Sequence, residues 1–204
     1  ESVLIPTESR FTACVSSQVG CSLSCKFCAT GYLPRKRNMD FDEIVDEVTL
    51  LNEQTQKQYG RNLTNIVFMG MGEPLLNYRN VMSAIDKITS PEGLGMSPRR
   101  ITVSTAGVAK MIKQLGDDKV RFKLALSLHA ATDEKRNEIM PINETNNLKA
   151  LIEALNYFYK MTGNEITLEF ILFKDFNDSL EDADDLVKVY RQIPADLVNI
   201  IEYN

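Results

Sequence analysis

Residues 20–31 read GCSLSCKFCATG and place three of the chain's four cysteines, Cys21, Cys25 and Cys28, within eight positions. Thiolates at such short spacing are ligands for zinc or for an iron–sulfur cluster. Structural zinc sites are normally closed by four ligands, and the sequence has no second cysteine pair. Three cysteines would hold a four-iron cluster with one iron open, and Phe27 would shield that cluster from water. A zinc knuckle, or buried cysteines without a ligand role, are the alternatives.

The cysteine loop follows the first of six apolar, β-branched runs that predict strands, and stretches with helical periodicity separate these runs. Asp40 and Glu43 predict a capping box at the start of a helix whose apolar face includes Ile44 and Val48. The alternation predicts an α/β fold with a parallel sheet, either open and doubly wound or a six-stranded partial (β/α)6 barrel. In both, the functional site lies at the carboxyl ends of the strands, where the cysteine loop falls. The predicted strands are 11–18, 64–69, 100–104, 122–128, 166–173 and 197–203, and further helical patterns cover 148–159 and 180–190.

The length of 204 residues, 44% of them hydrophobic, predicts a single domain over 1–204. No apolar run approaches the roughly 20 residues needed to cross a bilayer, and no signal-peptide pattern is present, so we expect a cytoplasmic protein with no membrane partner. We also expect a monomer. Cysteine clustering without a secretory signal favours metal or redox chemistry over a disulfide framework. The formal net charge of −5 argues weakly against nucleic-acid binding by the bulk surface. The runs Arg35-Lys36-Arg37 and Arg99-Arg100 can still contact phosphates, or be solvated surface charges.

Glycines and polar residues follow the other predicted strands. GMGEPLLN at 70–77 has glycines that let the backbone approach a ligand, and Glu73 can accept a hydrogen bond from an ammonium group. An ordinary strand-to-helix turn is the alternative reading of that segment. STAG at 104–107 follows the third strand and SLH at 127–129 ends the fourth. His129 is the only histidine; a lone histidine is more often a structural residue than a catalyst, and only its position makes it an acid–base candidate.

The loop CSLSCKFC resembles the C-x3-C-x2-C loop of the radical S-adenosylmethionine superfamily, whose fold is a six-stranded partial barrel. GMGEPLLN, VSTAG, SLHA, MPIN and VNIIEYN, with ESVLIP and CVSSQVGC, resemble the RlmN family of adenosine C2 methyltransferases over essentially the whole chain. GMGEPLLN is closer to RlmN than to the related Cfr enzymes, which methylate C8. The resemblance implies a 4Fe–4S cluster on Cys21, Cys25 and Cys28. It implies S-adenosylmethionine contacts from Gly72, Glu73, Ser104, Ser127, Leu128, His129 and Asn204.

Two residues acquire catalytic roles from the resemblance. Glu1 matches the family's proton acceptor. Cys14, by itself a small buried hydrophobe, matches the cysteine that resolves the RNA adduct by forming a disulfide bond with a methyl-carrying cysteine. That partner belongs to a C-terminal extension, and the family also has an N-terminal helical RNA-binding region; neither is present in this chain, which begins at Glu1 and ends at Asn204. We therefore expect the chain to bind the cluster and S-adenosylmethionine but not to methylate RNA.

The partners implied by the resemblance are large-subunit ribosomal RNA and transfer RNA, with the adenine unstacked, and an electron donor such as flavodoxin or ferredoxin. Three classes of function stay open at this point. The first is a radical RNA methyltransferase core. The second is another radical S-adenosylmethionine enzyme, such as a glycyl-radical activase or a peptide-modifying enzyme. This alternative is disfavoured by the segments MPIN, VSTAG and ESVLIP. The third is a non-enzymatic metal-binding module, which metal content would separate from the others.

Overall fold

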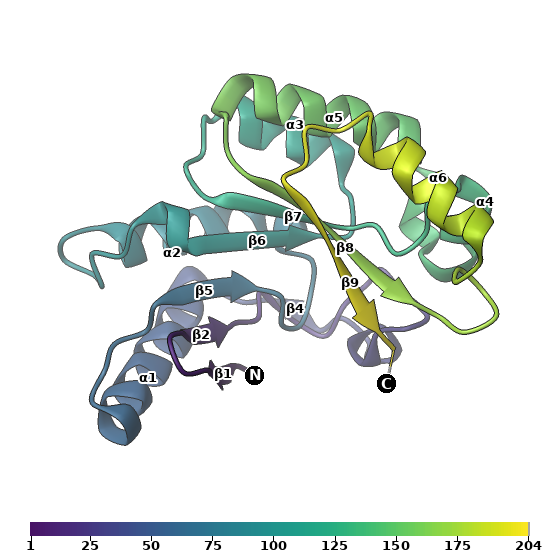
Figure 1. Cartoon of the computed structure of the whole chain (residues 1–204). Helices are drawn as coiled ribbons and strands as arrows, with labels where there is room; N and C mark the ends of the chain where they lie inside the picture. Colours follow the sequence, from purple (N-terminus) through teal and green to yellow (C-terminus); the bar gives the residue numbers. More distant parts are fainter. Residues whose placement is uncertain (204) are drawn as a thin grey trace. The chain divides into compact units, whose positions relative to one another are not determined.

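A computed structural model of the chain describes residues 1–203 (Figure 1). These residues divide into two compact units. The first unit consists of Glu1–Ser22 and Ala29–Ser104, and the second of Leu23–Cys28 and the chain from Thr105 onward. Asn204, which the sequence predicts as a contact of S-adenosylmethionine, lies outside the described residues. No helix within residues 1–203 combines the length and the apolar character needed to cross a membrane.

The first unit is built on parallel strands with one antiparallel neighbour. Its elements are, in chain order, β1 (Val3–Pro6), β2 (Phe11–Cys14), β3 (Gln18–Val19), the 3-10 helix η1 (Ala29–Tyr32), β4 (Arg37–Asn38), α1 (Phe41–Tyr59), β5 (Asn65–Phe68), η2 (Pro74–Asn77), α2 (Tyr78–Thr89), η3 (Pro98–Arg100) and β6 (Ile101–Thr105), whose last residue belongs to the second unit. β2 pairs with β5, and β5 with β6, in parallel. β1 pairs antiparallel with β2, and β3 and β4 form a separate two-stranded ribbon.

Helix α1 forms because both of its ends are satisfied and one face is apolar. The Glu43 carboxylate accepts from the backbone N–H of Asp40 at 2.9 Å, and the predicted capping box is confirmed. Gly60 ends the helix in the left-handed conformation, with φ at 64° and its N–H donating to the carbonyl of Gln56 at 2.8 Å. Ile44 and Val48 are fully buried, so the helix contributes its apolar face to the core of this unit.

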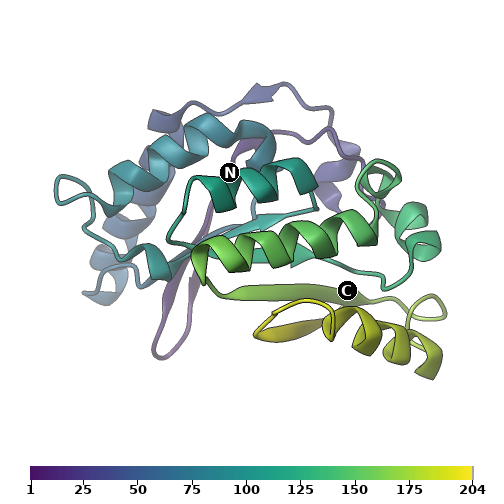
Figure 2. The same ribbon diagram turned by 90° about the horizontal axis from the view of Figure 1, so that it is seen from above.

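The second unit holds three parallel strands and the helices that cover them. Its elements are α3 (Ala109–Asp117), β7 (Lys123–Ser127), α4 (Asp133–Ile139), η4 (Pro141–Glu144), α5 (Leu148–Thr162), β8 (Ile166–Leu172), α6 (Leu180–Tyr190) and β9 (Leu197–Glu202). β7 pairs with β8, and β8 with β9, in parallel. α3 and α5 lie side by side (Figure 2). They approach closely at Gly116, where an added Cβ would lie 3.2 Å from the ring of Tyr157.

The predicted α/β class with six parallel strands is confirmed, and three differences have physical causes. The first strand ends at Cys14 because the N–H groups of Ser17 and Gln18 donate to the carbonyl of Met71 instead of continuing a ladder. β1 was not predicted, since its four residues carry no clear alternation. The apolar face expected on α6 is mostly solvent-facing: Leu180 is 88% exposed, while Asp182 is buried.

Candidate functional site

In the first unit, the loop after β5 packs directly on the segment after β2. Gly72 has a φ of +96°, and an added Cβ would lie 2.4 Å from Cβ of Gln18, so only glycine fits there. The backbone N–H of Glu73 donates to the side-chain oxygen of Gln18 at 2.9 Å. The amide nitrogen of Gln18 in turn donates to Asn38 at 2.8 Å. Gln18 therefore fixes the backbone of the predicted Gly72-Glu73 contact, a role that sequence reasoning missed.

Glu73 is 2% exposed, and a backbone N–H of its own loop orients its carboxylate. One oxygen accepts from the N–H of Leu75 at 3.0 Å and caps η2. The sequence predicts Glu73 as an acceptor for an ammonium group. The cap shows how such a carboxylate is held in one orientation in a buried place, as a specific acceptor requires.

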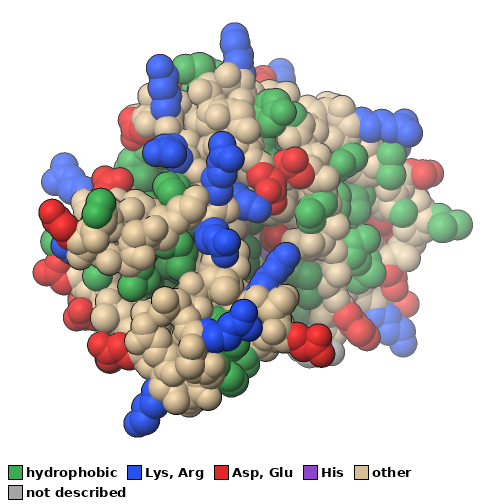
Figure 3. Space-filling view, turned by 60° about the vertical axis from the view of Figure 1, so that its left-hand side comes forward, with side chains coloured by type: hydrophobic (Ala, Val, Ile, Leu, Met, Phe, Trp, Pro, Cys, Tyr) green, Lys and Arg blue, Asp and Glu red, His purple; other side chains and the backbone are tan. Residues whose placement is uncertain are grey.

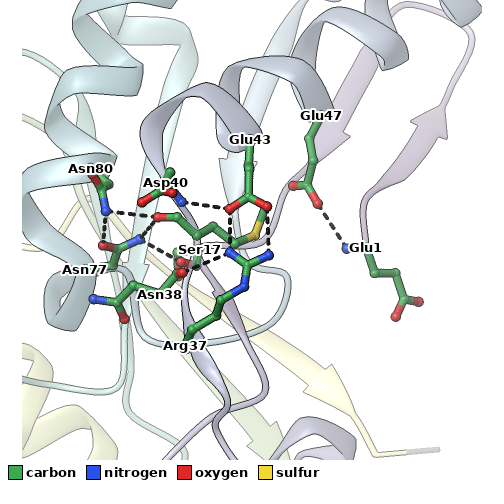
Figure 4. Close-up of polar contacts among 10 residues, drawn as sticks. Glu1, Ser17, Arg37, Asn38, Asp40, Glu43, Glu47, Asn77 and Asn80 are labelled. Atoms are coloured by element: carbon green, nitrogen blue, oxygen red, sulfur yellow. Dashed lines mark hydrogen bonds and ion pairs between the residues drawn. The ribbon is translucent and has the colours of Figure 1, made fainter.

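Asn77 is a second buried polar residue that sequence reasoning missed. Its side-chain N–H groups donate to the carbonyls of Ser17 at 2.8 Å and Met39 at 2.7 Å (Figure 4). Asn80 donates to the carbonyl of Met39 and to the side-chain oxygen of Asn77. These bonds anchor the segment after β2 to the helix that follows β5. A buried amide after an apolar strand was the only available sequence signal, and it does not reveal which carbonyls it reaches.

Cys14, on β2, is half-buried and outside any disulfide, as are the other three cysteines. Burial raises the pKa of the Cys14 thiol, a backbone hydrogen bond from Met69 opposes the shift, and the nearby Glu47 carboxylate adds to it. Glu47 itself accepts from the N–H of Ser16 at 2.9 Å and from the terminal ammonium of Glu1 at 3.0 Å (Figure 4). The Glu1 side chain is 76% exposed. Its predicted role as a proton acceptor therefore stays a prediction.

In the second unit, the segment carrying Cys25 and Cys28 rests on a small apolar cluster. The backbone N–H of Lys26 donates to the carbonyl of Ile139 at 3.0 Å, and that of Cys28 donates to the carbonyl of Cys25 at 3.2 Å. The side chains of Cys25 and Phe27 pack against a buried cluster made of Ala130, Ile139 and Met140.

His129 lies against Phe27, with ring centroids 4.6 Å apart in an edge-to-face arrangement. Its Nδ1 accepts from the N–H of Ile171 at 3.2 Å, and its carbonyl accepts from Asn177 at 2.8 Å. Burial lowers the pKa of His129 to about 3, and the charge of Arg136 adds to this effect. The imidazole is therefore neutral at ordinary pH, which argues against the acid–base role that its position suggested. The ring instead orients Phe27.

Ser127 and Leu128, at the end of β7, are tied down through their backbones. Leu128 is fully buried, and its N–H donates to the carbonyl of Glu169 at 2.9 Å. Both carbonyls accept from the guanidinium of Arg136, at 3.2 Å for Ser127 and 3.1 Å for Leu128. The side chain of Ser127 is half-buried, as is that of Ser104 on β6 in the first unit.

The three loop cysteines fit an iron–sulfur cluster by the chemistry of the donor set, which is three half-buried thiols outside any disulfide. Cys21 belongs to the first unit, where its N–H donates to the carbonyl of Leu33 at 3.5 Å, and Cys25 and Cys28 belong to the second. Within residues 1–203, no three His, Cys, Asp or Glu side chains are gathered in an arrangement that could hold a metal ion. The fit to the cluster therefore rests on the ligand type and its spacing.

Two arginines of the basic run after the cysteine loop form hydrogen bonds or ion pairs within the protein. Arg37 forms a bidentate ion pair with Glu43 at 2.6 and 2.8 Å (Figure 4), and Arg35 donates to Asn38 at 2.9 Å. Arg100 donates to the carbonyl of Thr64 at 3.2 Å. Lys36 is exposed. On the face drawn in Figure 3, Lys and Arg side chains stand out from the surface with Asp and Glu side chains among them, in line with the acidic total.

Comparisons with known proteins match the chain to the Radical SAM superfamily over residues 15–187. It is 61% identical over its whole length to a relative from Cytophaga hutchinsonii and 60% identical to one from Christiangramia forsetii, both named "Probable dual-specificity RNA methyltransferase RlmN". The chain spans 56% and 58% of those relatives, so it covers little more than half of their length. It matches the crystal structure of a radical SAM methyltransferase from Sphaerobacter thermophilus with a TM-score of 0.95 and 39% identity, covering 100% of this chain and 59% of the other. Streptococcus suis SuiB, at 17% identity and a TM-score of 0.63 over 94% of this chain and 39% of the other, shares the fold.

Proposed function

The chain belongs to the radical SAM superfamily, and on that premise we propose that it is the core of an enzyme that methylates C2 of an adenosine in RNA. The proposal is supported by the identity of 61% to an RlmN relative over all 204 residues. The observation that carries it is that Gly72-Glu73, Ser104 and Ser127 lie at or just after the carboxyl ends of the parallel strands β5, β6 and β7. The proposed activity is that of a protein with the full length of these relatives, of which this chain spans 56% and 58%.

Cys21, Cys25 and Cys28 are the proposed ligands of a 4Fe–4S cluster. When bound, the cluster would supply the electron that splits S-adenosylmethionine into methionine and a carbon radical, the reactive species that methylation of an unreactive adenine carbon requires. The contribution of the chain is to exclude water from the cluster. Phe27, packed against His129 and against Phe173 with ring centroids 5.8 Å apart, supplies an apolar surface beside the cysteines.

S-adenosylmethionine is the proposed second cofactor. In the first unit, Gly72 lets the backbone come close, and the capped carboxylate of Glu73 accepts from the ammonium group of the ligand. Ser104 offers a hydroxyl there, and Ser127 and His129 offer contacts in the second unit. Leu128 is fully buried with its N–H and carbonyl both bonded, so its proposed contact is one of shape rather than of hydrogen bonding.

Ribosomal and transfer RNA are the proposed substrates. We also propose a cytoplasmic, monomeric enzyme that receives its electron from flavodoxin or ferredoxin. Tyr32 is 76% exposed and Leu33 50% exposed, just ahead of the exposed Lys36. An exposed aromatic ring beside a cation is suited to stacking on an unpaired base and contacting a phosphate. Cys14 keeps its proposed role as the resolving cysteine, and Glu1 its role as proton acceptor.

The decisive test is anaerobic reconstitution of the chain with iron and sulfide, followed by electron paramagnetic resonance with and without S-adenosylmethionine. We expect a reduced cluster signal that changes on adding the ligand. Cys21→Ala, Cys25→Ala and Cys28→Ala should each abolish stable cluster uptake, whereas Cys14→Ala should retain it. Cluster uptake that survives loss of a loop cysteine, or zinc bound without sulfide, would overturn the proposal.

A second experiment uses a protein with the full length of the relatives and ribosomal RNA as substrate. Mass spectrometry should find 2-methyladenosine in the RNA, whereas 8-methyladenosine would favour the Cfr-type reaction.

A further inference from the structure

Arg136, on α4, is a fully buried arginine that ties several segments of the second unit together. Its guanidinium donates to the carbonyls of Ser127, Leu128 and Ala106, the last at 2.6 Å. It also donates to the side-chain oxygen of Asn143 in η4 at 2.5 Å. All of these acceptors are neutral. Arg136 therefore has hydrogen-bond acceptors, but none of these acceptors carries a negative charge.

A buried charge is normally paired, because removing an ion from water costs several kcal/mol. Within residues 1–203, Arg136 makes no ion pair with Asp or Glu. Burial lowers the pKa of Arg136 to about 10, and the attraction of Cys25 and of Asp133 opposes that lowering. At neutral pH the side chain is a cation, and Asp133 is the carboxylate that attracts it.

The cysteine segment is docked on the same helix. The N–H of Lys26, next to Cys25, donates to the carbonyl of Ile139, the last residue of α4. Cys25 also packs against the cluster of Ala130, Ile139 and Met140. The cysteine segment is therefore hydrogen-bonded to the same helix, α4, that carries Arg136.

We propose that Arg136 is a positioning residue that supplies a fixed positive charge next to the cysteine loop and thereby raises the reduction potential of the cluster bound there. The inference rests on the proposed function, since it takes Cys25 to be a cluster ligand. The added electron increases the negative charge of the cluster, so a buried cation nearby favours the reduced state. The carbonyl and amide acceptors hold that cation without neutralising it.

The test compares Arg136→Met with Arg136→Lys in the reconstituted 204-residue chain, by a redox titration with dithionite followed by electron paramagnetic resonance. Both variants lose the guanidinium fork, so the structural cost is shared and the difference between them isolates the charge. We expect Arg136→Met to lower the equilibrium constant for one-electron reduction by about tenfold, or 59 mV, and Arg136→Lys to stay close to the parent protein. Equal potentials in both variants would overturn the inference.

A gentler variant keeps the test decisive if both Arg136 substitutions prevent folding. Asp133→Asn removes the anion that partly balances Arg136, and its remaining oxygen can still accept from Asn143 and from the N–H of Leu148, as Asp133 does at 2.9 and 2.8 Å. We expect the reduction equilibrium to shift about threefold toward the reduced cluster. An unchanged or lowered potential would contradict a role for the charge. Failure of the parent chain to take up any cluster would overturn the proposed function itself, which separates the two failures.

Discussion

Replacing His129 by Asn should remove a pH dependence from the folding stability of the chain. His129 is 4% exposed, and burial lowers the pKa of its imidazole from 6.5 to about 3, with the charge of Arg136 as the second cause. The residue has a φ of 55°, a left-handed conformation that Asn tolerates better than most residues. The oxygen of Asn can also accept a hydrogen bond, as Nδ1 of His129 does from Ile171. The substitution therefore deletes the titration with the least disturbance of the backbone.

The sign follows from which state binds the proton. Between pH 6.5 and about 3, the unfolded chain carries a protonated His129 and the folded chain does not. The stability that the neutral imidazole contributes is complete above 6.5 and is lost as pH falls through that window. The slope approaches about 1.4 kcal/mol per pH unit. Between about pH 7.5 and about pH 5, the loss comes to about 2 kcal/mol.

The assay is urea unfolding, followed by circular dichroism at both pH values, for the parent chain and for His129→Asn. The free energy of unfolding should fall by about 2 kcal/mol more in the parent chain than in the variant. Burial raises the pKa of Glu47, whose contribution has the opposite sign, but it is common to both proteins and cancels in the difference. Equal pH dependence in the two proteins would refute the argument that His129 is buried in its neutral form.

Three further substitutions test the packing that supports the site, each by urea unfolding. Gly72→Ala should cost about 2 kcal/mol because its Cβ would lie 2.4 Å from Gln18. Gly60→Ala, also at a positive φ (64° against 96°) but with nothing within 4 Å, should cost about 1 kcal/mol, and equal costs would contradict the close contact. Leu115→Ala should cost about 3 kcal/mol, since Leu115 is fully buried on α3, and a cost below about 1 kcal/mol would mean that α3 is loosely packed. Ser179→Ala removes the cap of α6 and should cost about 1 kcal/mol, while Ser179→Thr, which keeps the hydroxyl, should cost less.

Local chemistry accounts for what could be predicted of the fold. The six parallel strands and the capping box of α1 are encoded by side chains within a few residues of one another, so periodicity and cap residues reveal them. The inward face of α6 was not predictable in this way. Asp182 turns inward because it caps the helix with Ser179 and pairs with Lys135, which lies 47 positions earlier in the chain. An apolar stripe in the sequence does not show that such a distant cation is available.

For the site, the sequence by itself determined the thiols proposed as ligands, because their type and spacing lie on one loop of eight residues. It also determined which segments end parallel strands, since those follow directly from the alternation of elements. Only the tertiary structure decided the state of the groups around them. His129 is neutral because it is buried, and Arg136 forms no ion pair because its hydrogen-bond acceptors are carbonyls and an amide brought together by folding. Burial and the identity of distant partners set the electrostatics of a site, and neither is a property of residues that are neighbours in sequence.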